Sequence, residues 1–102
     1  MDEFIKEMTK YEDGIDLIVE YNDGVVILAK ENGIHESDNG LDMDEEGYEE
    51  FYACLLRIVK ILEPKNYSGK LKEGGLTEIY LNAPIIEVRL TDGSIVWTRR
   101  EI

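Results

Sequence analysis

The chain has 102 residues, of which 43% are hydrophobic, so it can bury one core and is too short for two ordinary domains. We therefore expect residues 1–102 to form a single domain. The 23 acidic and 11 basic side chains give a formal net charge of −12. This charge argues against binding to nucleic acid or to an anionic membrane surface, because both attract positive charge.

The sequence shows no targeting or membrane segment. Its N-terminus lacks the basic and apolar regions of a signal peptide. The longest nearly uncharged apolar stretches, residues 25–29 and 51–56, are far shorter than the roughly 20 residues that span a bilayer. The single cysteine, Cys54, lies in an apolar run and has no disulfide partner in the chain, which indicates a buried thiol. These features predict a cytoplasmic protein.

A short helix and a hairpin are predicted in the first thirty residues. Phe4, Met8 and Tyr11 recur at helical spacing, which predicts an amphipathic helix over about residues 2–10. Residues 15–21 alternate between apolar and polar, as in a half-buried strand. The pair Asp23-Gly24 is typical of a tight turn, and the apolar return strand that follows suggests a central position in a sheet.

The C-terminus repeats this arrangement. Residues 86–90 alternate, Asp92-Gly93 turns the chain, and residues 95–97 return, so a second hairpin is predicted. A further short strand is expected at 76–81. The composition of residues 63–75 indicates a loop.

The segment from Tyr48 to Leu62 supports two interpretations. Its apolar residues recur at helical spacing, acids stand at its start, and Pro64 follows its end, all of which favour a helix. However, its β-branched and aromatic residues favour a strand, and a continuous apolar run also fits a buried strand. Both interpretations stay open at this stage.

The first forty residues resemble the first motif of Sm-like proteins, which are small, strongly bent β-barrels of the SH3-like kind. In that motif a strand ends at Asp-Gly, a small residue follows, and an Asn closes the motif; here these are Asp23-Gly24, Ala29 and Asn39. Members that bind RNA hold a base with the closing Asn and with an Asp shortly before it. His35 stands at that Asp position, and Glu31 stands where a core Leu is usual.

The second Sm motif is absent, so the resemblance implies a barrel and, at most, a degenerate RNA-binding site. A second similarity, from Glu36 to Cys54, is to acidic bacterial proteins. The fold class that we predict is mainly β: a small antiparallel sheet or a partly closed SH3/Sm-like barrel with a short N-terminal helix. The alternative is α+β, with residues 45–62 as a helix packed on the sheet.

The charge is concentrated in one stretch. Residues 1–50 carry 17 acids and 3 lysines, for a net −14, whereas residues 51–102 carry 8 basic and 6 acidic residues, for a net +2. Residues 36–50 hold eight acids and no base. Such a run repels itself and stays solvated unless a positive partner neutralises it. We predict an acidic surface for a basic protein, formed by Asp38, Asp42, Asp44, Glu45, Glu46, Tyr48 and Tyr52, with Trp97 as a further interface anchor.

The same stretch contains a fragment of a calcium-binding loop. Asp42, Asp44 and Glu46, followed by Gly47, match the start of an EF-hand loop, in which alternate oxygens surround the ion. Ala53 stands where the loop needs its bidentate Glu. These three acids are therefore a weak candidate metal site, and a divalent-cation-regulated module is an alternative function.

No pattern in the sequence indicates an enzyme or a cofactor. The only histidine, His35, has no second histidine with which to form a zinc site, and no glycine-rich phosphate loop is present. Carboxylates are too abundant to single out an acid–base pair. The leading hypothesis is a non-enzymatic interaction module, and antitoxin or immunity proteins that mimic nucleic acid have this charge character.

Overall fold

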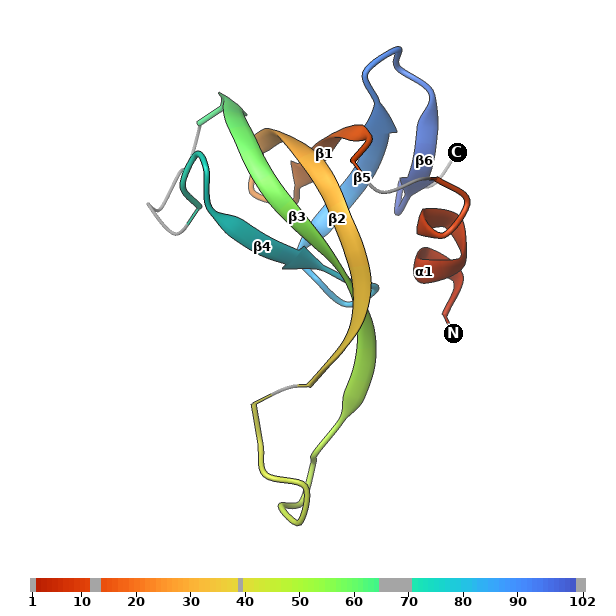
Figure 1. Cartoon of the computed structure of the whole chain (residues 1–102), viewed down its shortest axis with the longest axis vertical. Helices are drawn as coiled ribbons and strands as arrows, with labels where there is room; N and C mark the ends of the chain where they lie inside the picture. Colours follow the sequence, from red (N-terminus) through yellow and green to blue (C-terminus); the bar gives the residue numbers. More distant parts are fainter. Residues whose placement is uncertain (1, 12–13, 39, 65–70, 101–102) are drawn as a thin grey trace.

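The computed structural model describes residues 2–11, 14–38, 40–64 and 71–100, and every structural statement below concerns these residues. They form one antiparallel sheet of six strands with one short N-terminal helix (Figure 1). This confirms the prediction of a mainly β fold. The α+β alternative is wrong, because residues 50–63 form a strand. The predicted closing Asn39 and residues 65–70 of the predicted loop lie outside the described residues.

The first four strands form a meander, and the last two form a hairpin that returns to pair with the first strand. Neighbours in the sheet follow the order β4-β3-β2-β1-β5-β6, so the last two strands add to the free side of β1. The predicted strands at 15–21, 76–81, 86–90 and 95–97 are confirmed, with shifts of one or two residues at their ends. The bounds are α1 (Glu3–Met8), β1 (Asp16–Tyr21), β2 (Val26–Asp38), β3 (Glu50–Glu63), β4 (Leu76–Ile79), β5 (Ile85–Leu90) and β6 (Ile95–Thr98).

Strand β3 lies in the middle of one half of the sheet, between β2 and β4. Its residues Cys54, Leu56 and Ile58 point into the core and are almost fully buried, whereas Arg57 and Val59 between and beyond them are exposed. This alternation has the period of a strand. Both β2 and β4 form backbone hydrogen bonds with β3. The local sequence of β3 does not reveal this pairing.

Strand β2 continues well past Ala29, the last residue of the apolar run that predicted the return strand, because the chain accommodates a bulge. The register between β2 and β3 shifts between Glu31 and Ile34, and Gly33 lies at a φ of +107°, a conformation that suits glycine. The Glu31 side chain, only 2% exposed, turns back so that its Oε1 accepts the Gly33 N–H at 2.8 Å. A buried glutamate thus stabilises the bulge and lets the strand continue to Asp38.

The short helix α1 covers one side of the core. Asp2 caps it, with Oδ1 accepting the Ile5 N–H at 2.8 Å. Phe4, Ile5 and Met8 are fully buried among side chains of the sheet. The prediction of an N-terminal helix is confirmed, and the helix ends at Met8. No helix among the described residues is long and apolar enough to cross a membrane.

Candidate protein-interaction surface

The β2–β3 hairpin projects from the body of the molecule (Figure 1). The pairing of β1 with β2 extends only to Lys30, and the pairing of β4 with β3 only to Cys54. From His35↔Ala53 to Asp38↔Glu50, β2 and β3 therefore pair only with each other. The hairpin lies along the longest axis of the molecule, which measures 43 Å. We call residues 36–50 the acidic hairpin.

Two successive turns build the tip of the acidic hairpin. The Glu45 N–H donates to the Asp42 carbonyl at 3.0 Å, and the Tyr48 N–H donates to the Glu45 carbonyl at 3.2 Å. Gly47 has a φ of +88°, a backbone conformation in which any side chain would be strained. The predicted acidic loop is therefore a compact double turn that holds its carboxylates in solvent.

The tip also exposes apolar surface. Met43 is 79% exposed, and Leu41 is exposed as well. Methionine adapts to irregular apolar pockets, and exposed apolar groups surrounded by polar ones commonly mark contact surfaces. An apolar side chain thus lies between Asp42 and Asp44 at the far end of the molecule.

Below the tip, Tyr48 lies in a strongly negative environment. Its hydroxyl donates to Glu50 Oε1 at 2.9 Å. This hydrogen bond, together with the nearby carboxylates of Asp38 and Glu36, raises the pKa of the Tyr48 phenol above its ordinary value. Tyr48, Glu36, Asp38 and Glu50 line one shallow pocket on the ribbon.

The structure brings most of the predicted interaction residues together, and it places Trp97 elsewhere. The residues that share the acidic hairpin or its base are Asp38, Asp42, Asp44, Glu45, Glu46, Tyr48 and Tyr52. Trp97 lies on β6, at the opposite end of the strand order, and is half-buried. Its ring meets Phe4 edge-on, with centroids 5.1 Å apart, and the Arg99 guanidinium carbon lies 4.7 Å from its centroid. Trp97 therefore packs against the core rather than beside the acids.

The candidate metal residues do not converge. Asp42, Asp44 and Glu46 are all exposed on the double turn. In the part of the chain that the structure describes, no group of three or more His, Cys, Asp or Glu side chains is arranged to hold a metal ion. Divalent binding there stays a prediction.

His35 and Cys54 both have structural neighbours. His35 Nε2 lies 3.5 Å from Glu78 Oε1, and the Ser37 hydroxyl donates to the other oxygen of Glu78 at 2.9 Å. On the intervening strand β3, the residue paired with His35 is Ala53, which is small and fully buried. Side chains of β2 and β4 can therefore meet across it. Cys54 is fully buried and contacts Glu31, as expected for a core thiol.

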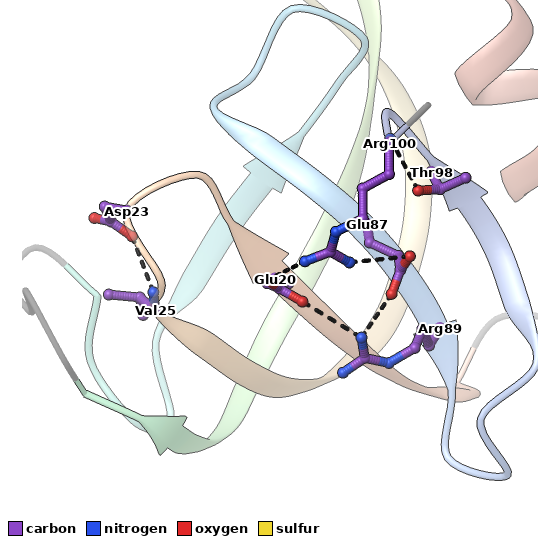
Figure 2. A network of polar contacts seen from close by, with 7 residues as sticks. All are labelled: Glu20, Asp23, Val25, Glu87, Arg89, Thr98 and Arg100. Atoms are coloured by element: carbon purple, nitrogen blue, oxygen red, sulfur yellow. Dashed lines mark hydrogen bonds and ion pairs between the residues drawn. The ribbon is translucent and has the colours of Figure 1, made fainter. Parts of the chain in front are cut away.

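Three arginines from the C-terminal half are engaged within the molecule, and Figure 2 shows two of them, Arg89 and Arg100. Glu20 and Glu87 lie directly opposite on β1 and β5, where two like charges repel. Arg89 Nη1 lies 2.6 Å from Glu87 and 3.4 Å from Glu20, and Arg100 also bridges both carboxylates. Arg99 Nε donates to the Ile85 carbonyl at 3.0 Å. Much of the positive charge in this half thus stabilises the sheet.

Sequence reasoning did not assign a role to Phe51 or Tyr80. Their rings pack together with centroids 4.7 Å apart, although one residue is on β3 and the other follows β4. They line a pocket at the base of the acidic hairpin. The aromatic cluster around residue 50 was visible in the sequence, but its pairing with Tyr80 depends on the register of β3 and β4.

The comparisons with known proteins give one match. A family model described as "Cognate immunity protein YxxD" matches residues 1–101. Searches of curated proteins and of solved structures return no match. A cognate immunity protein binds a partner toxin, so the match supports a protein-interaction role and suggests a non-enzymatic binder.

Proposed function

Since the chain belongs to the cognate immunity protein YxxD family, we propose that it neutralises its cognate toxin by binding it through the acidic hairpin. The surface of the toxin that it contacts is basic. The observation that carries this proposal is the hairpin itself, which projects from the sheet with eight acids and no base.

The composition and shape of the hairpin support a role in binding. Charges that complement a partner speed the encounter and fix its orientation, whereas apolar and aromatic groups contribute most of the affinity. The acidic hairpin has both kinds of group, because Met43 is exposed among the acids at the tip and Tyr52 is exposed at the base.

Binding alone accounts for neutralisation in this proposal. An acidic hairpin that covers a basic surface on the toxin excludes any anion that this surface would otherwise bind. No catalytic step by this chain is needed. The proposal therefore predicts a stable stoichiometric complex and protection that depends on the amount of immunity protein.

The test uses the protein encoded beside this chain's gene as the candidate toxin. Replacing Asp42, Asp44 and Glu46 by their amides removes three charges and keeps the side-chain shapes. If each carboxylate contributes as an exposed ion pair, about 0.5 kcal/mol, the affinity falls about tenfold. Calorimetry or surface plasmon resonance at two salt concentrations measures the loss, and co-expression measures growth protection.

The matched control removes the same charge elsewhere. Glu3→Gln, Glu7→Gln and Asp16→Asn neutralise three acids on α1 and β1, outside the acidic hairpin. The control should bind the toxin within about twofold of the unmodified chain, because distant exposed charges are screened by salt. Equal losses in both triple variants, or binding that is indifferent to salt, would contradict the hairpin as the contact surface.

A further inference from the structure

One feature that the proposed function leaves unexplained is the pocket at the base of the acidic hairpin. Most of its lining residues come from the acidic hairpin, from the start of β3 and from the connection between β4 and β5. Its walls include Phe51 and Tyr80, whose rings are tilted by 33° to each other. Both rings are only half-buried, so part of their surface faces solvent.

Three carboxylates surround these rings. Asp38 is the last residue of β2, Glu49 immediately precedes β3, and Asp2 caps the start of α1. Asp38 uses one oxygen to accept the Gly40 N–H, and Asp2 uses one to cap α1. No basic side chain lines the pocket among the residues that the structure describes. The pocket thus combines aromatic walls with carboxylates, and no basic side chain of the described residues is in its lining to neutralise them.

This combination matches one side chain better than others. A guanidinium group is planar, weakly hydrated and able to stack on an aromatic ring while it donates to carboxylates at its edge. The chain itself stacks a guanidinium on an aromatic ring at the end of β6, where the Arg99 guanidinium lies over the Trp97 ring. A divalent metal ion fits less well, because the described residues hold no cluster of ligands and aromatic walls supply none.

We infer that the pocket formed by Phe51, Tyr80, Asp38, Glu49 and Asp2 is a socket for an arginine side chain of the cognate toxin. The inference rests on the proposed function for the identity of the partner. The arginine stacks on the ring pair and donates to the carboxylates. Meanwhile the tip of the acidic hairpin contacts the surrounding basic surface.

The socket can be tested without the toxin. The probes are N-acetyl-arginine amide and N-acetyl-citrulline amide, which have nearly the same shape and differ in charge. In ¹⁵N-labelled protein, the arginine probe should shift the amide resonances of Phe51 and Tyr80 in a saturable way at millimolar concentration. The citrulline probe should leave them unchanged. Equal shifts with both probes, or no saturable shift with arginine, would overturn the inference.

Two variants test whether the arginine probe binds in the pocket. Asp38→Asn and Glu49→Gln together keep the shape of the pocket and should weaken the arginine probe about fivefold, as expected for two exposed ion pairs. Glu46→Gln, on the tip and outside the pocket lining, serves as the control and should not change the probe affinity. If the control weakens the probe as much as the double variant does, the probe binds the general acidic field and the socket is wrong.

A second, independent test of the socket measures how a change in its aromatic wall affects the affinity for the toxin. Phe51→Leu keeps an apolar residue and removes the ring, so toxin affinity should fall at least about tenfold, as for a contact near the centre of an interface. A far-ultraviolet spectrum checks that the strand persists. If Phe51→Leu binds the toxin normally while the amide variants at the tip do not, the socket fails and the proposed function stands. If neither set of variants affects binding, both fail.

Discussion

At the scale of single residues, the clearest feature is the way in which this acidic protein places negative charge inside its fold. Glu87 is only 6% exposed and faces Glu20 across two paired strands. Two guanidinium groups resolve the repulsion, because each bridges both carboxylates (Figure 2). Arg100 comes from beyond the end of β6, so the network also holds the last described residue against the sheet.

This network makes stability depend on pH. Burial on its own raises the pKa of Glu87, but hydrogen bonds from Arg89, Arg100 and Thr98 outweigh it, so the pKa lies below its ordinary value of 4.5. A carboxylate with a lowered pKa stabilises the fold above its ordinary pKa, and that contribution is lost as the pH falls through the folded-state pKa. We expect the free energy of unfolding to decrease as the pH falls below 4.5.

Glu87→Gln isolates this contribution. The variant should be less stable than the unmodified chain near pH 7, and its stability should fall less between about pH 5 and pH 3, because the titrating group is gone. Urea unfolding at several pH values measures both effects, and Glu3→Gln on the surface of α1 is the control. If the free energy of unfolding falls with pH as steeply in Glu87→Gln as in the control Glu3→Gln, other groups produce the acid dependence.

At the scale of elements, the hairpins were predictable and the length of β2 and the state of β3 were not. The two Asp-Gly turns have a local cause, since Asp23 and Asp92 each accept a backbone N–H two residues on. Strand β3 has a non-local cause, because β2 and β4 pair with both of its edges. The helical spacing of its apolar residues favoured a helix, whereas its β-branched residues and continuous apolar run favoured a strand, so the sequence left both interpretations open.

The same reasoning applies to the candidate site. The negative charge of residues 36–50 and the aromatic residues beside it were evident in the sequence. The projection of the hairpin was not, because it depends on where the neighbouring strands β1 and β4 stop pairing. Tyr80 joins the site through the register of β4, and the bulge at Gly33 depends on a hydrogen bond from its N–H to the buried Glu31.

The bulge gives a prediction at this scale. Gly33→Ala forces a side chain into a φ of +107°, although the added carbon meets no other atom. We expect a loss of about 1–2 kcal/mol in the free energy of unfolding, the usual cost of an L-residue in this conformation. Asn32→Ala, at the neighbouring exposed position, should change it by less than about 0.5 kcal/mol. Chemical denaturation measures both, and equal effects would contradict the role of the conformation.

At the scale of the whole molecule, stability and charge are separated in space. The core consists of side chains from α1 and the body of the sheet, and among the described residues none of its buried members comes from 36–50. The acidic hairpin in turn carries eight of the 23 acids. The protein thus keeps its strongest self-repulsion away from the part that must stay packed.

This separation predicts that the hairpin tip can be removed. Replacing residues 39–49 by Asn-Gly, a favoured two-residue hairpin turn, should leave the sheet intact. The expected change in the free energy of unfolding is within about 1 kcal/mol, or a shift in Tm of no more than about 4–8 °C. Toxin binding should be lost in the same variant. A shortened chain that unfolds would show that the tip supports the core, and one that still protects cells would show that binding lies elsewhere.

The independence of the acidic hairpin from the core has an evolutionary consequence. An immunity protein must follow its toxin whenever the surface of the toxin changes. Here the fourteen described residues of the acidic hairpin are exposed or half-exposed, and substituting them repacks no side chain of the core. Related chains can therefore acquire new partners through substitutions in one short segment, while the remaining residues continue to specify the same sheet.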